Sequence, residues 1–239
     1  MFVLYCPVTK ETGISLARDL NCESGKVPPE DVIDILIRWG SSARIRHIPT
    51  TVLNKKRVVL KLTNKMETME ILSSRGISIP PLDVHPPCIG RSTYHTQGQG
   101  LWFCWEENQI ESARREGADY FIKYIPPCQE WRVHVIGGEA VFVQNKYPTN
   151  RISTAFMGIQ GFQNRWHERM VDISSAPEEV INQAVAAVNI LGADFGGVDV
   201  LWGIDGRPYV LEINSGPALP TPETRAPYIS YFRRFFSRE

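Results

Sequence analysis

Near its C-terminal end the chain carries a predicted hairpin that brings two carboxylates face to face. Residues 198–202 and 209–213 have the composition of β-strands, and Asp205-Gly206 between them is a favoured two-residue turn. A turn of that length pairs Asp199 directly with Glu212. Two like charges in facing positions repel each other unless a cation lies between them. The hairpin therefore predicts a cation site, and it predicts that neutralising either carboxylate relieves repulsion in the metal-free protein.

Asn214 lies two residues beyond Glu212 and shares its sheet face, because side chains alternate along a strand. Two carboxylates and an amide carbonyl are hard oxygen donors, which suit Mg²⁺, so Asp199, Glu212 and Asn214 are candidate metal ligands. The opposite face is predicted to be the core side, lined by Val198, Val200, Leu211 and Ile213. A four-residue loop would keep this arrangement, whereas a loop of odd length would break it. The alternative is a solvated outer face, although that face also carries Leu201 and Val210.

Charge and cysteine content exclude several classes of protein. The 239 residues hold 26 Lys and Arg against 26 Asp and Glu, so the chain lacks the basic excess that drives nucleic-acid binding. No apolar run approaches the ~18 residues of a membrane-spanning helix, and the N-terminus lacks the basic start of a signal peptide. The five cysteines form no C-x-x-C pair, which is typical of buried thiols in a reducing compartment. We therefore expect a cytoplasmic protein with no nucleic-acid or membrane partner.

Helical and strand patterns are mixed along the chain, which predicts an α+β fold. Residues 64–75 have the spacing of an amphipathic helix. A second helix is predicted to open at Ala176-Pro177-Glu178-Glu179, with the proline in its first turn, and to end before Gly192. Residues 92–100 form a polar, glycine-bearing loop between two short predicted strands. Residues 147–176 are polar and are predicted to be irregular, which in a compact chain often indicates a functional segment.

The hairpin sequence resembles the metal-binding end of a known enzyme family. Gly197-Val198-Asp199-Val200-Leu201, followed by Tyr209-Val210-Leu211-Glu212-Ile213-Asn214-Ser215-Gly216-Pro217, is similar to the ATP-grasp ligases, in particular to the branch of the ribosomal-protein glutamate ligase and its small phage and bacterial relatives. The helix with Lys65 at its start and the strand Glu130-Trp131-Arg132 resemble two further motifs of that family. The resemblance implies an ATP-grasp fold, in which two small α+β lobes clamp a nucleotide.

The resemblance covers about residues 60 to 220 and implies a division of the chain into three parts. Residues 1–62 would form a short N-terminal lobe, 63–124 the lid subdomain, and 125–239 the C-terminal subdomain with the metal site.

The resemblance also implies a phosphate site between the lobes. Lys65 and Arg91 would bind the phosphates, and residues 92–100 would form a flap over them. Backbone amides near Gly98 and Gly100 would approach phosphate oxygens, since no side chain obstructs them there. Arg91 stands where the family normally has lysine, which keeps the charge but changes the geometry. The alternatives are a surface arginine at a strand end and a plain loop.

The adenosine part of the nucleotide would lie against the hinge between the lobes. The residues implied there are Lys123, Tyr124 and Ile125, whose backbone would read the adenine edge. Lys123 replaces the usual acid of the family. Glu130 would accept hydrogen bonds from the ribose, although an acidic residue at a strand end is equally common on a plain surface.

Arg132 is expected to stabilise charge on the phosphoryl group during transfer. The resemblance also places Lys146 in the site, on the next predicted strand. With Gly137-Gly138 as a two-residue turn, however, Arg132 pairs with Val143 and Lys146 lies on the other sheet face, so its role requires a bulge or a strand twist. His134 shares the face of Arg132, and we interpret it as a packed, hydrogen-bonded histidine.

The function that the resemblance implies is ATP-dependent joining of a carboxylate to an amine. The carboxylate would attack the γ-phosphorus of ATP, and the amine would capture the acyl phosphate, releasing ADP and phosphate. The expected cofactors are ATP and Mg²⁺, with Mn²⁺ as an alternative metal, and the expected substrates are small-molecule or peptide carboxylates and amines. A small-molecule kinase and a nucleotide-binding module without turnover remain open. Neither the substrates' identity nor the oligomeric state follows from the sequence.

Overall fold

The N-terminal part of the protein is a parallel sheet with helices on one face. The computed structural model describes residues 1–30, 33–47, 49–94, 100–148 and 166–235. The strands lie in the order β2-β1-β3-β4, with β1 Phe2–Tyr5, β2 Glu23–Gly25, β3 Ile35–Trp39 and β4 Thr51–Leu53. A short 3₁₀ helix (η1, Pro7–Thr9) leads into α1 (Lys10–Leu20), which packs beside the C-terminal α6 (Pro222–Arg233). All of β1 is buried, as is typical of a strand inside a parallel sheet.

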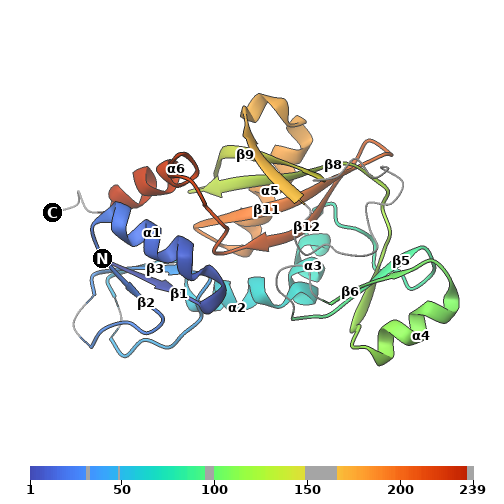
Figure 1. The fold of residues 1–239 in the computed structure, drawn as a ribbon, viewed down its shortest axis with the longest axis horizontal. Coiled ribbons are helices and arrows are strands. Elements are labelled where there is room, and N and C mark those ends of the chain that lie inside the picture. The colour runs from blue at the N-terminus through green and yellow to red at the C-terminus, as the bar shows by residue number, and fades with distance from the viewer. Residues whose placement is uncertain (31–32, 48, 95–99, 149–165, 236–239) are drawn as a thin grey trace.

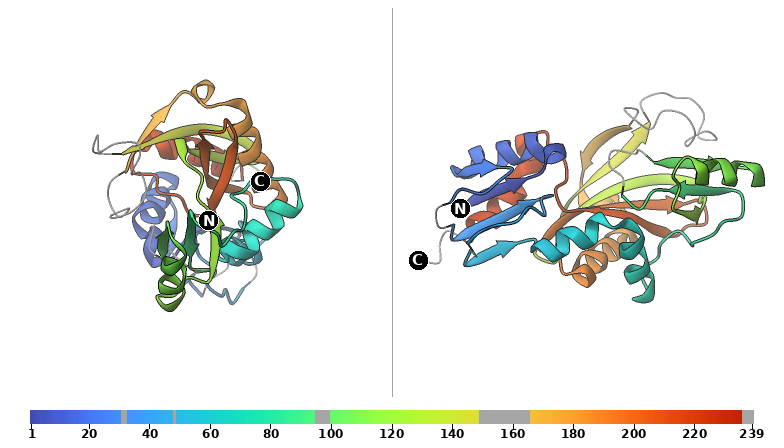
Figure 2. Two further views of the ribbon diagram at one scale, coloured as in Figure 1. Left: turned by 90° about the vertical axis from the view of Figure 1, so that its right-hand side faces the viewer. Right: turned by 90° about the horizontal axis from the view of Figure 1, so that it is seen from below.

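A small antiparallel sheet lies at the opposite end of the molecule from the N-terminal sheet (Figure 2). Its order is β6-β5-β7, with β5 Cys88–Arg91, β6 Leu101–Cys104 and β7 Tyr120–Lys123, and α4 (Glu107–Arg115) packs on it. Two helices, α2 (Lys56–Thr63) and α3 (Lys65–Ser74), lead from the first sheet toward it. The side chain of Asn64 caps α3 by accepting from the Glu67 N–H, so the predicted helix over 64–75 is confirmed.

The third sheet has five antiparallel strands in the order β10-β9-β8-β11-β12 (Figure 1). They are β8 Pro127–Ile136, β9 Glu139–Pro148, β10 Trp166–Val171, β11 Phe195–Gly203 and β12 Pro208–Asn214. A 3₁₀ helix (η3, Ile173–Ser175) precedes α5 (Glu178–Leu191). The predicted end before Gly192 is confirmed, and Gly192 has a φ of 70°, whereas Pro177 is the N-cap instead of lying in the first turn. Residues 147–176 are not irregular throughout, because β10 pairs with the edge of β9. Residues 149–165 lie outside the described chain.

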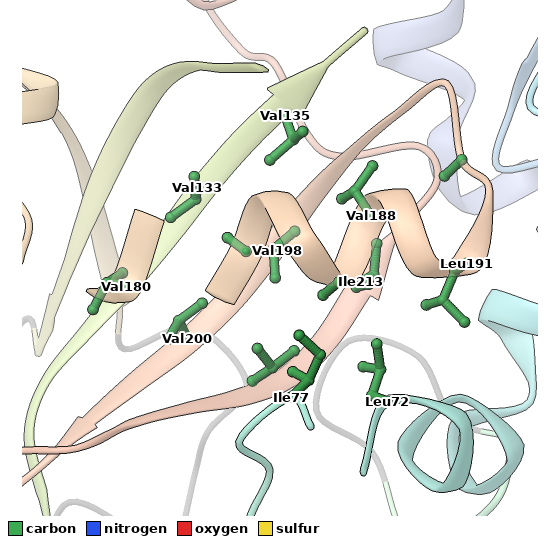
Figure 3. Packing of buried hydrophobic residues seen from close by; sticks show 14 of the residues in the cluster. Leu72, Ile77, Val133, Val135, Val180, Val188, Leu191, Val198, Val200 and Ile213 are labelled. Carbon is green, nitrogen blue, oxygen red and sulfur yellow. The ribbon is translucent and has the colours of Figure 1, made fainter. Parts of the chain in front are cut away.

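The main core lies between α5 and one face of the five-stranded sheet. Figure 3 shows Val180, Val188 and Leu191 of α5 against valines of β8 and β11, with Leu72 and Ile77 closing the edge. Each such side chain contributes about 1.5–3 kcal/mol by leaving water. Because this face is filled by apolar side chains, the charged residues of the same strands lie on the opposite face.

The β11–β12 hairpin differs from the predicted one near its turn. The Gly203 N–H donates to the Arg207 carbonyl at 2.9 Å, so the loop holds residues 204–206 rather than two residues. A loop of odd length was expected to break the arrangement of the carboxylates. A bulge next to Asp199 shifts the register back, however, and Asp199 pairs with Glu212 as predicted.

The same bulge changes which apolar residues of β12 reach the core. Val210 pairs with Val200 and is 1% exposed within the main core, whereas Leu211 has no partner on β11 in this register and is half-buried. The prediction that Leu211 lies on the core face and Val210 on the other face is therefore wrong. In a regular strand Val210 and Glu212 would lie on the same face. The extra residue of the bulge between them places Val210 on the core face and Glu212 on the opposite face.

A second bulge lies between β8 and β9. The strands turn at Gly137-Gly138 as predicted, but the register shifts between His134 and Val135. Arg132 consequently pairs with Gln144 and Glu130 with Lys146, so the predicted pairing of Arg132 with Val143 is wrong. Val143 belongs to the main core. The bulge that the predicted role of Lys146 requires is present.

The N-terminal sheet packs tightly against the end of the five-stranded sheet. Trp39 stacks on Phe195 with ring centroids 5.2 Å apart, and Tyr228 of α6 meets both rings edge-on. Gly216 lies so close that a Cβ there would be 2.8 Å from the Gly40 nitrogen. The division of the chain at residues 62 and 124 stays a prediction.

All five cysteines are free thiols. Only Cys88 and Cys104 are buried, facing each other across β5 and β6, and burial raises the pKa of Cys88 to about 11. Within the described parts of the chain, no helix combines the length and the apolar character needed to cross a membrane.

Candidate active site

Arg132 and Asp199 form a two-point ion pair between neighbouring strands. The Arg132 Nε donates to Asp199 Oδ1 at 2.7 Å and its Nη2 donates to Oδ2 at 2.9 Å. The two residues are directly opposite in the β8–β11 register, on the face away from α5. Planar guanidinium and carboxylate groups match in this geometry, which orients both side chains.

Lys146 joins this pair from β9. Its Nζ lies 2.8 Å from Asp199 Oδ2 and 2.6 Å from Glu130 Oε1. The lysine side chain is 8% exposed and that of Asp199 is 6% exposed, so this is a nearly buried network. The structure thus brings Lys146 onto the face of Arg132 and Glu130, where the resemblance required it.

Glu212 is held by residues from two other elements. Lys65, the first residue of α3, places its Nζ 3.6 Å from Glu212 Oε2, and the Asn214 side-chain nitrogen donates to Glu212 Oε1 at 2.9 Å. Arg91, at the end of β5, is 7% exposed and acts on Glu212 through its charge. Residues predicted separately along the chain therefore converge on one carboxylate.

The two carboxylates are ionised at neutral pH. Burial acts to raise the pKa of Glu212, but the positive charges of Lys65 and Arg91 lower it by a larger amount. The pKa of Glu212 therefore lies well below its ordinary value. Burial likewise opposes ionisation of Asp199, and Arg132 and Lys146 more than offset it, so its pKa is also lowered. Burial acts to lower the pKa of Lys146, but Asp199 and Glu130 raise it above the ordinary value.

The donor set fits a hard divalent cation. Asp199 and Glu212 are adjacent across the hairpin and ionised, and the Asn214 amide donates through its nitrogen, which leaves its carbonyl oxygen as an acceptor. Oxygen donors of this kind suit Mg²⁺. No cluster of three or more His, Cys, Asp or Glu that could hold a metal occurs among the described residues, so an amide would have to complete the set.

The base of the predicted flap contacts the start of α3. The Lys65 N–H donates to the Thr93 carbonyl at 3.3 Å, and the Thr93 N–H donates to Asp119 Oδ2 at 2.7 Å. The Ser92 N–H donates to the carbonyl of Gly100, which has a φ of 68°. Gly98 lies outside the described residues. The two ends of the loop are thus held beside Lys65 and Arg91.

The hinge residues are tied to the prolines that precede β5. The Lys123 N–H donates to the Pro81 carbonyl at 2.8 Å, and the Tyr124 N–H donates to the Pro87 carbonyl at 3.0 Å. Lys123 is exposed, whereas Tyr124 and Ile125 are half-buried. The backbone N–H groups of Lys123 and Tyr124 are therefore already hydrogen-bonded within the protein. Recognition of an adenine base by residues 123–125 would use the other backbone groups of this segment.

An aromatic cluster beside the hinge was not predicted from the sequence. The ring of Tyr124 lies edge-on to Phe103 and Trp105, with centroids 6.3 and 5.1 Å apart. These residues come from the end of β6 and the turn after it. The signal that could have revealed them is the aromatic spacing after the flap, Trp-Phe-Cys-Trp.

His134 is a packed, hydrogen-bonded histidine, as interpreted from the sequence. Its two ring nitrogens lie 2.9 Å from the Tyr228 hydroxyl and 2.8 Å from Gln144 Oε1, and its ring stacks on Phe142. Burial lowers its pKa to about 3, so it is neutral and cannot serve as a cation. Gln144 and Tyr228 were missed by the sequence reading. Because Gln144 pairs with Arg132 across the strands, the hydrogen-bonded group of His134, Gln144 and Tyr228 lies beside Arg132.

Comparison with known proteins identifies the fold. No protein-family model matches the chain. The chain is similar to two curated proteins named probable alpha-L-glutamate ligase. The one from Aliivibrio salmonicida is 28% identical, with 70% of this chain and 60% of that protein covered. The one from Methanococcoides burtonii is 26% identical, with 72% and 62% covered. The chain thus spans about three fifths of the length of the curated relatives it matches.

Solved structures match over almost the whole chain. D-alanine–D-alanine ligase from Bacillus anthracis gives a TM-score of 0.74 at 14% identity, with 98% of this chain and 93% of that chain covered. The ATP-grasp ligase PsnB, in complex with a minimal precursor, gives a TM-score of 0.69 at 16% identity, with 98% of both chains covered. The chain therefore has the fold of the ATP-grasp ligases.

Proposed function

We propose that the protein is an ATP-dependent carboxylate–amine ligase that works through an acyl phosphate and releases ADP and phosphate. The observation that carries the proposal is a charged network over one face of the five-stranded sheet, in which four cations from the sheet, α3 and β5 surround three carboxylates. The cations are Lys65, Arg91, Arg132 and Lys146, and the carboxylates are Glu130, Asp199 and Glu212. One positive charge remains in excess, in a nearly buried setting. Such a site favours an anionic ligand, and a metal bound to the carboxylates would strengthen that preference.

The proposed cofactors are ATP and Mg²⁺, with Mn²⁺ as an alternative metal. Among the similar solved structures, PsnB is complexed with Mg and ADP, and the Bacillus anthracis enzyme is complexed with ATP. Asp199, Glu212 and Asn214 would hold the metal, which when bound would neutralise charge on the phosphates. Lys65, now 3.6 Å from Glu212, would turn to a phosphate oxygen once a metal takes over that carboxylate.

The chain's own residues would act by position and charge. Lys65 and Arg91 would bind the phosphates from the side of α3 and β5, with the flap base beside them. Arg132 and Lys146, held by Asp199, would face the transferring phosphoryl group and stabilise its charge. Their rigidity matters because a preorganised cation need not reorient during the reaction. Glu130 would orient Lys146 and would accept hydrogen bonds from the ribose of the nucleotide.

No histidine or cysteine in the described chain is arranged as a covalent catalyst, which supports direct attack by the substrate carboxylate. His134 is neutral and bonded on both nitrogens, and the thiol of Cys88 is protonated because burial raises its pKa to about 11. The proposed substrates are a small-molecule or peptide carboxylate and an amine.

The test is acyl-phosphate trapping. The protein is incubated with ATP, Mg²⁺, hydroxylamine and pools of amino acids and peptides, and hydroxamate and nucleotide products are measured by mass spectrometry. We expect hydroxamate together with ADP in the wild type, and loss of both in Arg132→Ala. Arg207→Ala, which removes an exposed arginine from the hairpin turn, is the matched control. AMP and pyrophosphate as products would contradict the proposal, and a stable phosphorylated product without hydroxamate would indicate a kinase.

A further inference from the structure

A cavity of about 490 Å³ lies on the outer face of the N-terminal sheet, away from the site described above. Along β3, Ile37 and Trp39 face α1 and α6, so the alternate residue Arg38 faces the other side. On that side Ala43 and Ile45, from the chain between β3 and β4, pack against Leu36 and its neighbours. Of the eight described residues that line the cavity, four are cations and none is acidic.

Arg38 is a buried cation without a carboxylate partner among the described residues. It is 2% exposed, and its Nη1 donates to the carbonyl oxygens of Ser41 and Ala43 at 3.1 and 2.9 Å. Its Nε is buried and meets no hydrogen-bond acceptor in the described chain. Burial lowers the pKa of Arg38, and no negative group among the described residues offsets this effect. A buried charge normally has a counterion, so the guanidinium edge is suited to an anion.

The start of α2 adds positive potential to the same cavity. Lys55 is the N-cap of α2 and Lys56 is its first residue, and both line the cavity. The N-terminus of a helix carries a partial positive charge and usually attracts acidic residues or a capping oxygen. Here the first turn has no acidic residue and no side-chain cap. The sequence thus gathers cations where the helix itself disfavours them, and an anion in the cavity would relieve this repulsion.

The other described lining residues are mostly apolar, since three of the four are Ile45, Pro49 and Val52 and only Thr50 is polar. Ile45 and Val52 line the cavity and pack against the buried side chains of Phe2, Leu4 and Leu36. The volume is that of a site for a small molecule. The cavity therefore combines a basic side with an apolar side.

We propose that this cavity binds a small oxyanion of at least two negative charges, carried on carboxylate or phosphate groups, with an apolar flank. The charged group would lie between Arg38 and the start of α2, with Arg44 at the rim, and the apolar part would lie against Ile45 and Val52. The site is separate from the residues assigned to the ligase reaction, and the inference does not rest on that activity.

Isothermal titration calorimetry with two matched dianions tests the proposal. Phenyl phosphate represents the phosphate source and phenylsuccinate the carboxylate source, and each carries one apolar ring. Arg38 is unsuitable for substitution because its Nη1 holds the loop at Ser41 and Ala43. The variant is therefore Arg44→Gln combined with Lys55→Gln, since both side chains are exposed. Lys10→Gln, which changes an exposed side chain at the start of α1 on the other sheet face, is the control.

We expect one-to-one binding of at least one probe, weakened about tenfold or more in the double variant and unchanged in Lys10→Gln and in Lys65→Gln. The probe that binds identifies the source of the charge. Binding of neither probe at millimolar concentration would overturn the proposal. Equal affinity in the double variant, or a loss in Lys65→Gln instead, would place the binding elsewhere and also overturn it.

Discussion

Asp199→Asn should destabilise the ligand-free protein strongly, and more than Glu212→Gln does. If only the two facing carboxylates are considered, either substitution should leave the protein equally stable or more stable, because removing one charge would relieve repulsion. In the structure, however, Asp199 is the shared partner of Arg132 and Lys146. Asparagine would leave two nearly buried cations with one amide oxygen between them and would turn an NH₂ group toward one of them.

The magnitude follows from the burial and the contacts. The Asp199 side chain is 6% exposed and lies within 2.7–2.9 Å of three donor atoms on Arg132 and Lys146. Removing one partner of a buried ion pair costs about 3–5 kcal/mol, and because Lys146 keeps Glu130 we expect about 3 kcal/mol. For a chain of this size that is about 6–12 °C in melting temperature. The Glu212 side chain is 22% exposed and its contact with Lys65 is longer, at 3.6 Å, but Lys65 and Arg91 lower its pKa, so its replacement should cost about 1–2 kcal/mol, less than that of Asp199.

Urea unfolding at neutral pH, without nucleotide or divalent metal, measures both variants against the wild type. Glu212→Gln is the matched control, because it removes the other carboxylate of the same pair. If Asp199→Asn proved as stable as the wild type or more stable, repulsion between the carboxylates would outweigh the ion pairs, and the account of this network would be refuted.

Three further predictions concern other parts of the structure. Burial lowers the pKa of His134 from about 6.5 to about 3, so the unfolded state binds its proton first as the pH falls. Urea titrations should therefore show stability falling by up to about 1.4 kcal/mol per pH unit below about pH 6.5, and His134→Gln should flatten this slope. Gly216→Ala should cost about 1–3 kcal/mol in urea unfolding, because its Cβ would meet the backbone of Gly40; wild-type stability would contradict this contact. Arg132→Lys should lower kcat more than it raises KM for ATP, since lysine keeps the charge but loses the two-point pair with Asp199; a change in KM alone would assign Arg132 to binding.

The local patterns of the sequence were sufficient for most of the helices and strands, although not for β10, which lies in a segment predicted to be irregular. The helix at 64–75 was predictable because its spacing and its Asn64 cap act within a few residues. The pairing of Asp199 with Glu212 was predicted correctly but from a wrong premise, because the turn has three residues instead of two and a bulge next to Asp199 restores the register. Asn214 was predicted from the alternation of side chains along the strand, whereas Lys65 and Arg91 were predicted through resemblance to a family rather than through local patterns.

The two bulges and the partners of the charges were decided only by the tertiary structure. A bulge depends on how a strand fits both of its neighbours and the helix beneath it, so nothing within the hairpin itself shows that Leu211 is the extra residue or that Lys146 lies beside Arg132. Ion pairs such as Lys65 with Glu212 join residues far apart in the chain, and their energies depend on burial. The sequence by itself determined which charges the sheet carries, and packing determined that the cations neutralise the carboxylates in the ligand-free protein.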